Sequence, residues 1–200
     1  MLDNDLISMF REFADVFKEY NSKLNLISKN DEKYIYEKHI LDSISISRFF
    51  KEYDFLPDNI LDIGTGGGFP AIPIAIMYPD INVIGIDSIL KKINAVSEIS
   101  YRLGLKNISF IRERVENYHE QKFDCVVSRA VAKIDKLVEY AYPLLNDNGY
   151  LVLYKSKTVD EEINNAKNLI RKYSMKIKPV IKYDLELAEN YERCLVILQK

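Results

Sequence analysis

The sequence predicts an α/β fold with a Rossmann-like, mostly parallel sheet whose last strand is antiparallel, preceded by a helical cap at the N-terminus. From residue 58 onward, short apolar runs alternate with longer segments of helical periodicity, which is the pattern of strand–helix–strand units. A glycine-rich turn follows the first of these strands. Residues 1–57, in contrast, open with apolar residues at helical spacing. These three observations together indicate the fold class.

The chain is expected to divide into a helical cap at residues 1–57 and a sheet domain at residues 58–200. The cap should begin with an amphipathic helix whose apolar face contains Leu6, Met9, Phe10, Phe13, Val16, Phe17 and Tyr20. Strands are predicted near residues 59–63, 82–87, 107–111, 123–128 and 149–154, and helices near 70–78, 89–103, 133–145 and 159–173. Residues 175–183 and 193–199 have strand patterns with no helix between them, which predicts an antiparallel finish.

The turn after the first strand has the composition of a cofactor site. The strand ends at Asp62 and Ile63, and the chain continues with glycine at positions 64, 66, 67 and 68 before a helix begins. Glycine has no Cβ, so the backbone can approach a ligand closely, and amide groups at a helix start point toward it. The second strand ends at Asp87, a position suited to bind ribose hydroxyls. A cofactor that contains a nucleoside is therefore expected here.

Two cofactor classes are compatible with the positions of the glycines. A dinucleotide fingerprint is met only by Gly66, Gly68 and Ala71, and it places the first strand out of register. The alternative, with Asp62, Gly64, Gly66 and Gly68 in register, resembles the first motif of class I S-adenosylmethionine-dependent methyltransferases. An acidic residue also suits a cofactor that carries an ammonium and a sulfonium group. S-adenosylmethionine is favoured over a nicotinamide cofactor, and both over a turn without a ligand.

Composition excludes several classes of protein. The chain has 200 residues, of which 48% are hydrophobic, and no apolar run is long enough for a membrane span. The acidic start of the sequence is unlike a secretory signal, so we expect a cytoplasmic protein that does not enter membranes. Cys125 and Cys194 lie within apolar strand-like runs and should be buried, and no metal site is expected.

Ordered sequence blocks over nearly the whole chain resemble the family of ribosomal RNA small subunit methyltransferase G, also called glucose-inhibited division protein B. The glycine motif alone is typical of the wider superfamily, whereas the block that ends in Gly-Phe-Pro-x-Ile-Pro and the later Ser-Arg-Ala-Val-Ala are close to family-specific. Tyr20 and Ala71 depart from the tryptophan and glycine that are common there. The matching blocks are Tyr20–Leu26, His39–Ser43, Leu61–Ile76, Asp87–Lys92, Ser128–Ala132 and Glu192–Arg193.

The resemblance implies methyl transfer from S-adenosylmethionine to N7 of a guanine in 16S ribosomal RNA, within a 30S-like particle, by a monomer. The residues agree with this chemistry. N7 has a lone pair and no proton, so the reaction needs orientation more than a general base. The fourth strand is followed by Ser128, Arg129 and Ala130 rather than by a motif that holds exocyclic amines or by a nucleophilic cysteine. A methyltransferase with another substrate and a non-catalytic cofactor-binding module remain as alternatives.

Carried over from the family, the cofactor contacts fall on Gly64, Phe69, Val115, Glu116 and Arg129. Val115 and Glu116 would frame the adenine ring, and Phe69 would close the pocket, although core packing for Phe69 and a solvated acid at Glu116 are open alternatives. Arg129 is the candidate catalytic residue, because its guanidinium can hold a phosphate, a carboxylate or the O6 edge of guanine. The residue pattern itself adds Asp62, Gly66 and Asp87 to the cofactor site.

Two further features bear on substrate binding. His39 and Asp42 are three positions apart, so on a helix they would share one face and could reach the active-site mouth together, although a structural role is favoured for the histidine. The formal net charge of −2 is unfavourable for binding a polyanion, so basic residues must be concentrated locally. A stretch without acids is the candidate RNA-contacting face, with a lysine-rich helix kept soluble as the alternative; its basic residues are Lys167, Arg171, Lys172, Lys176, Lys178 and Lys182.

Overall fold

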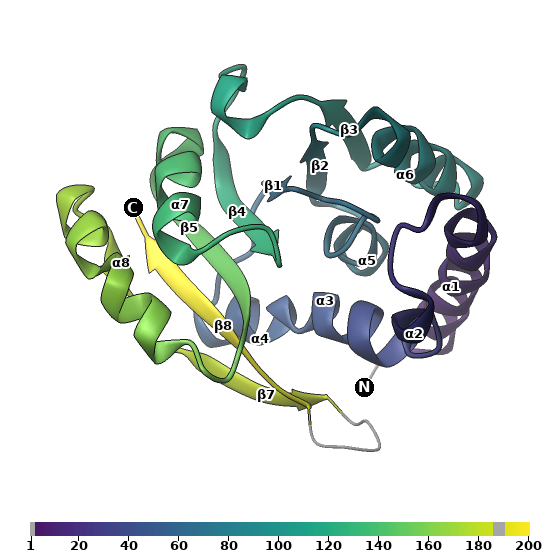
Figure 1. The fold of residues 1–200 in the computed structure, drawn as a ribbon, viewed down its shortest axis with the longest axis horizontal. Helices are drawn as coiled ribbons and strands as arrows, with labels where there is room; N and C mark the ends of the chain where they lie inside the picture. Colours follow the sequence, from purple (N-terminus) through teal and green to yellow (C-terminus); the bar gives the residue numbers. More distant parts are fainter. Residues whose placement is uncertain (1–2, 186–190) are drawn as a thin grey trace.

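The computed structural model describes residues 3–185 and 191–200 and contains an eight-stranded sheet covered by helices on both faces (Figure 1). The strand order is β3-β2-β1-β4-β5-β8-β6, and β7 also pairs with β8. The first five strands are parallel, whereas β8 runs antiparallel to β5. The predicted α/β class is thereby confirmed. The strands are β1 (Asn59–Ile63), β2 (Asn82–Asp87), β3 (Ile108–Arg112), β4 (Phe123–Arg129), β5 (Leu145–Ser156), β6 (Lys176–Ile177), β7 (Ile181–Leu185) and β8 (Tyr191–Gln199).

The end of the chain differs from the prediction in one respect. Residues 175–183 do not form one strand, because β6 and β7 are separated and pair with different parts of β8. Pro179 lies between them and has no amide hydrogen to donate to a neighbouring strand. The antiparallel finish is correct, but it consists of three strands.

Alternate residues along the strands enter two separate cores. In β1, Leu61 and Ile63 pack with the helices α7 (Ile134–Ala141) and α8 (Asp160–Lys172), whereas Ile60 packs on the opposite face. The opposite face is covered by α4 (Ile46–Glu52) and α5 (Ala71–Met77). After α7, residues Tyr142–Leu144 form a short 3-10 helix, so the helix predicted at 133–145 ends early. Both faces of the central strands are thus buried, as their continuous apolar runs require.

The N-terminal residues form helices that pack against the sheet domain through a third core. The helix α1 (Asn4–Leu24) is capped by Asp3, whose carboxylate accepts a hydrogen bond of 2.8 Å from the amide of Leu6. Its apolar face, with Phe10, Phe13 and Phe17 fully buried, contacts α5 and α6 (Leu90–Arg102). The amphipathic helix predicted here is confirmed.

After α1 the chain forms α2 (Lys29–Glu32), a π-helix at Ile35–Leu41 and a short helix α3 (Asp42–Ile44). The π-helix was not predicted from the sequence. A π-helix has a wider turn than an α-helix, and such turns are frequent at functional sites. Here it carries Lys38 and His39, and Asp42 follows directly.

Both cysteines are fully buried in strands, as predicted, and both are free thiols. Burial raises the pKa of the Cys125 thiol, so the neutral form is the stable one. Within residues 3–185 and 191–200, no helix is long and apolar enough to cross a membrane.

Candidate active site

The glycine-rich turn after β1 adopts backbone angles that favour glycine. Gly64, Gly66 and Gly68 have φ of 70°, 57° and 85°. The turn is fixed to the end of β2, because the amides of Gly64 and Thr65 donate to the carbonyl of Ile86 over 2.8 and 3.0 Å. A Cβ on Gly64 would collide with the side chain of Val131, whereas one on Gly66 would find its nearest neighbour 3.7 Å away. The two glycines therefore serve different purposes: Gly64 allows close packing against Val131, whereas Gly66 has room for a Cβ but a backbone conformation that favours glycine.

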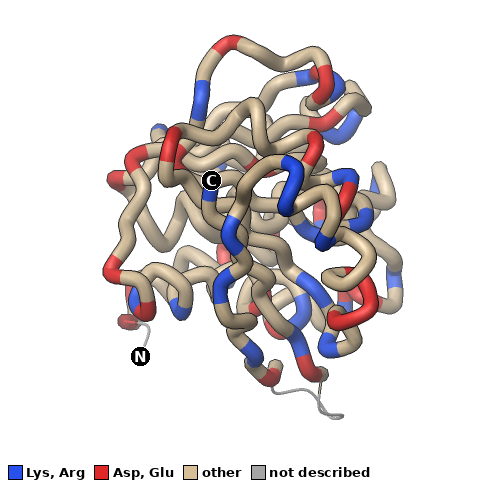
Figure 2. The backbone as a smooth tube through the Cα atoms, turned by 90° about the vertical axis from the view of Figure 1, so that its left-hand side faces the viewer, with Lys and Arg blue, Asp and Glu red and all other residues tan. Residues whose placement is uncertain are grey.

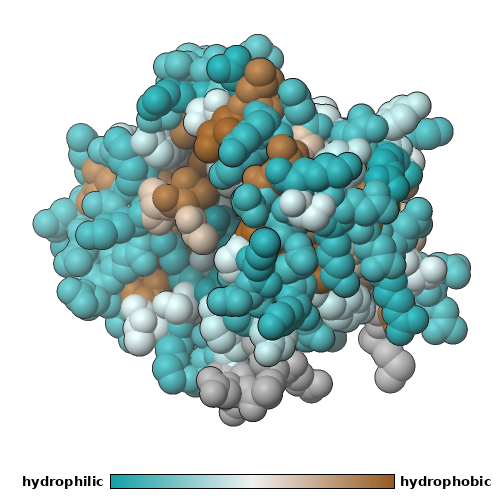
Figure 3. Space-filling model, turned by 45° about the vertical axis from the view of Figure 1, so that its right-hand side comes forward, coloured by the Kyte–Doolittle hydropathy of each residue, from teal (hydrophilic) through white to brown (hydrophobic). Residues whose placement is uncertain are grey.

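A cavity of about 520 Å³ opens beside this turn, at the carboxyl ends of the parallel strands. This volume is in the range of small-molecule and cofactor sites. In Figure 3, hydrophobic surface gathers around a hollow near the centre of the view, while most of the remaining surface is hydrophilic. The loops after β1, β2, β3 and β4 each contribute to the wall, which consists of residues 26–27, 63–67, 69, 86–89, 92, 113–116, 129–131 and 140.

Asp87 lies at the end of β2 in the cavity wall, as predicted, and is 9% exposed. Its carboxylate accepts hydrogen bonds from the amides of Gly66 over 3.2 Å and Ile89 over 2.9 Å. The ammonium group of Lys92 lies 3.8 Å from the same carboxylate. Asp87 therefore joins the glycine turn to the start of α6, in addition to facing the cavity.

Asp62 is placed differently from the other predicted site residues. It is fully buried behind the glycine turn and does not line the cavity. Neither carboxylate oxygen, nor the hydroxyl of Thr65, has a hydrogen-bond partner of good geometry among the described residues. Burial raises the pKa of Asp62 to about 7, and the nearby Thr65 hydroxyl and Arg129 charge only partly oppose this. Asp62 is therefore a buried acid whose ionisation state can change near neutral pH, and it lies behind the residues that line the cavity.

The opposite wall of the cavity contains Val115 and Glu116, which belong to a 3-10 helix at Val115–Asn117. The carboxylate of Glu116 accepts a hydrogen bond of 2.9 Å from the hydroxyl of Tyr140 on α7, and this tyrosine also lines the cavity. The sequence prediction for these two residues agrees with their position. It gave no indication of Tyr140.

Phe69 has two roles in the structure, because it lines the cavity and is only 4% exposed. Its ring contacts Phe13 and Phe17 of α1, with centroid separations of 5.3 and 5.0 Å. On the other side it meets the ring of His39 at 5.1 Å and the guanidinium of Arg129 at 5.3 Å. Phe69 therefore packs in the core and also forms part of the cavity wall.

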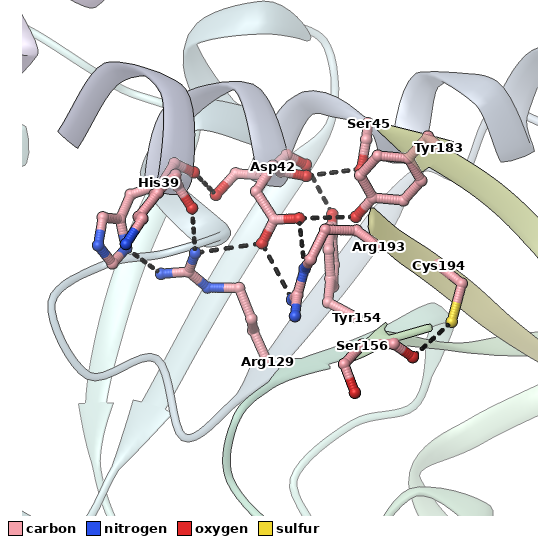
Figure 4. Close-up of polar contacts among 11 residues, drawn as sticks. His39, Asp42, Ser45, Arg129, Tyr154, Ser156, Tyr183, Arg193 and Cys194 are labelled. Atoms are coloured by element: carbon pink, nitrogen blue, oxygen red, sulfur yellow. Dashed lines mark hydrogen bonds and ion pairs between the residues drawn. The ribbon is translucent and has the colours of Figure 1, made fainter. Parts of the chain in front are cut away.

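Arg129 is held by three groups from the N-terminal helices (Figure 4). Its guanidinium donates to the backbone carbonyl of Lys38 over 3.2 Å, to the carboxylate of Asp42 over 3.3 Å and to Nδ1 of His39 over 2.8 Å. Because arginine only donates, His39 must carry its proton on Nε2. Burial and the charge of Arg129 lower the pKa of His39 to about 4, so the ring is neutral at pH 7.

Asp42 connects Arg129 to the C-terminal strands. The carboxylate, 2% exposed, also accepts from Arg193 over 3.1 and 3.2 Å and from the hydroxyl of Tyr183 over 2.7 Å. Two guanidinium groups thus share one buried carboxylate, and Figure 4 shows Asp42 between them. His39 and Asp42 lie together near the cavity as the sequence suggested, whereas Tyr183 was not predicted. The only signal for Arg193 was its presence in a matching block.

The segment after Arg129 is strained and held in place. Ala130 has a φ of 57°, which costs a residue other than glycine about 1 kcal/mol or more. Two residues on, the carbonyl of Ala132 accepts a hydrogen bond of 2.9 Å from Lys155, which also pairs with Glu162 over 2.7 Å. This segment also provides Val131, which packs against Gly64. Among the described residues no group of three or more histidine, cysteine or acidic side chains is arranged to hold a metal.

Comparison with known proteins agrees with this geometry. Residues 6–188 match the family model described as rRNA small subunit methyltransferase G. A ribosomal RNA small subunit methyltransferase G from Clostridium novyi is 36% identical over 198 residues, covering 96% of this chain and 80% of the relative. One of the same name from Staphylococcus epidermidis is 36% identical over 205 residues, covering 100% and 84%.

Solved structures of low identity show the same fold. Magnesium protoporphyrin IX methyltransferase from Synechocystis, with bound SAM, superposes with a TM-score of 0.66 at 14% identity, covering 94% of this chain and 97% of that one. A SAM-dependent methyltransferase from Methanosarcina mazei gives a TM-score of 0.57 at 17% identity, covering 75% and 96%. The family model and the curated relatives both extend over nearly the whole chain, so this protein belongs to the rRNA small subunit methyltransferase G family.

Proposed function

We propose that this protein transfers the methyl group of S-adenosylmethionine to N7 of a guanine in 16S ribosomal RNA. It acts as a monomer in the cytoplasm, on RNA presented by a 30S-like particle. Family membership supports the reaction class and the RNA. The choice of N7 depends on the environment of Arg129.

Two groups beside Arg129 that have the chemistry of a general base, His39 and Asp42, are already engaged, and the nearby Asp62 is fully buried behind the cavity wall. His39 accepts a hydrogen bond from Arg129 through Nδ1, and its pKa is lowered to about 4. Asp42 is bound by two guanidiniums and a tyrosine. A base is needed to methylate a nitrogen that carries a proton, but N7 of guanine has a free lone pair. This arrangement therefore suits N7.

The cavity residues fit S-adenosylmethionine, which supplies an electrophilic methyl group on a sulfonium. We assign the ribose to Asp87 and the adenine ring to the wall formed by Val115 and Glu116. Gly64 and Gly66 let the backbone pass beside the methionine part, and Phe69 closes that end of the cavity. Among the described residues neither carboxylate oxygen of Asp62 has a partner of good geometry, and its ionised form would be stabilised by a cationic ligand in front of it.

Arg129 would orient the guanine. Its side chain lines the cavity, and its guanidinium is fixed by the hydrogen bonds that it donates to three groups, which leaves two of its five N–H groups for a ligand. A guanidinium held in this way offers a planar set of donors to the O6 edge of guanine or to a flanking phosphate without losing further side-chain entropy. Orientation of this kind accelerates an in-line transfer that requires no proton abstraction.

The test is methylation of ribosomal particles from cells that lack the gene, with purified protein and methyl-labelled S-adenosylmethionine. Label should enter small-subunit RNA as N7-methylguanosine, located by cleavage at that base, and large-subunit RNA serves as the control. Calorimetry should show binding of S-adenosylhomocysteine and none of NADH. Label in a protein or a small molecule, or methyl on an exocyclic nitrogen, would refute the proposal.

A further inference from the structure

Two half-exposed tyrosines and a lysine form a cluster beside the Arg129 network. Tyr34, before the π-helix, is 42% exposed, and Tyr191, at the start of β8, is 44% exposed. The ammonium group of Lys38 lies 5.2 Å from the ring centroid of Tyr34 and 5.5 Å from that of Tyr191. The guanidinium of Arg193 lies 5.8 Å from the Tyr191 centroid. We refer to Tyr34, Lys38 and Tyr191 as the tyrosine–lysine cluster.

One residue of the cluster, Lys38, accepts a hydrogen bond from the cavity wall through its backbone. The backbone carbonyl of Lys38 accepts from Arg129, which lines the cavity. Arg193, next to Tyr191 in space, shares the carboxylate of Asp42 with Arg129. The cluster does not line the cavity itself, but it belongs to the two segments that hold Arg129 and Asp42 in place.

We propose that the tyrosine–lysine cluster is a platform for the unpaired nucleotides that flank the target guanine. The two rings would stack on bases, while Lys38 and Arg193 would contact the phosphates between them. Exposed aromatic rings combined with cations are the chemistry by which proteins bind single-stranded RNA, because every base has a stacking face and every nucleotide a phosphate. The inference rests on the proposed function, since it assumes that the substrate is RNA.

The charges around the cluster favour stacking as the main contribution. Asp31 lies 3.1 Å from the Lys38 ammonium, and Asp42 neutralises part of the charge on Arg193. A phosphate would have to share both cations with these carboxylates. The stacking of bases on tyrosine does not depend on net positive charge, and it remains when salt screens the phosphates. This provides RNA affinity to a protein whose formal net charge is −2.

The experiment compares two double variants. In the first, Tyr34→Ala and Tyr191→Ala are combined; in the second, both tyrosines become phenylalanine. Tyr101→Ala is the matched control, because this tyrosine is 79% exposed near the end of α6 and away from the cavity. Methylation of 30S particles should show KM for the particle raised about tenfold or more in the alanine pair, with kcat and S-adenosylhomocysteine affinity retained. The phenylalanine pair should recover most of the loss, and the increase in KM should persist at high salt.

A second measurement separates the platform from the proposed function. Fluorescence anisotropy with a single-stranded RNA oligonucleotide needs no methyl transfer, and its Kd should also rise about tenfold in the alanine pair. If the parent protein methylates no ribosomal RNA, the proposed function fails, but the oligonucleotide still decides the platform. If the folded alanine pair keeps the parent KM and Kd, or if the phenylalanine pair is as impaired as the alanine pair, base stacking here is refuted.

Discussion

Replacing Asp62 by asparagine should change how stability depends on pH. The fully buried carboxyl has its pKa raised to about 7, so the folded state binds a proton that the unfolded chain has lost. Stability linked to this group therefore falls as pH rises from about 4 to about 7. A shift of roughly three pKa units corresponds to about 4 kcal/mol, lost completely above pH 7 or so. Asparagine does not ionise, so the variant should lack this loss.

The assay is urea unfolding of parent and variant at several values between about pH 4 and pH 8. The difference in unfolding free energy, variant minus parent, should increase by about 4 kcal/mol across this interval. His39 contributes the opposite slope, because its pKa is lowered to about 4 and its stabilisation is lost as pH falls below the unfolded value. This contribution is present in both proteins and cancels in the difference. Parallel pH curves for the two proteins would refute the buried, protonated state of Asp62.

The same carboxyl should couple to the cofactor. A cationic ligand in front of Asp62 favours the ionised form, so binding of S-adenosylmethionine, which carries a sulfonium, should release a proton near pH 6 in the parent protein. Calorimetry in two buffers of different ionisation enthalpy measures this release. The asparagine variant, which has no proton to lose, should show none.

The other predictions concern the cavity wall and the RNA-binding surface. Asp87→Ala should weaken S-adenosylhomocysteine binding by about 1.5–3 kcal/mol and also lower stability, measured by calorimetry and urea unfolding, because the amides of residues 66 and 89 lose their acceptor. Arg129→Ala should lower the rate constant of methyl transfer at least about tenfold in single-turnover assays, and lysine should rescue little, since its ammonium cannot reproduce the planar guanidinium. Normal turnover of the lysine variant would indicate a simple charge effect. Gly64→Ala should impair binding through its collision with Val131, so adding Val131→Ala should restore part of the affinity. Replacing Arg171, Lys172 and Lys176 with glutamine should raise KM for RNA and flatten its salt dependence, and parallel salt curves would exclude this face.

The basic stretch that contains Arg171, Lys172 and Lys176 lies along one edge of the molecule. Figure 2 looks onto that side, where blue Lys and Arg positions form a broken column from top to bottom. The basic stretch follows the end of α8 and then β6 and β7, at the edge of the sheet beyond β8. The cavity lies at the ends of β1, β2 and β4. Salt-dependent affinity should come from the column, and salt-independent affinity from the tyrosine–lysine cluster.

The sequence predicted those parts of the site that depend on local pattern. The strands, the glycine turn and the position of Asp87 at a strand end all follow from periodicity and residue type over fewer than about ten positions. The depth of Asp62 could not be predicted in this way, because the alternation of residues along a strand gives the direction of a side chain but not the residues that cover it. The partners of Asp42 could not be predicted either, since Tyr183 and Arg193 are separated from it by 141 and 151 positions. Such contacts are fixed by the arrangement of whole elements.

The shared carboxylate of Asp42 has a consequence for biosynthesis. Asp42 is made early, whereas the guanidinium and hydroxyl that share its charge belong to β7 and β8, which are made last. A nascent chain that has already folded the glycine turn would lack two of the donors that hold this acid next to Arg129. The network around Arg129 is therefore complete only after β7 and β8 have joined the sheet.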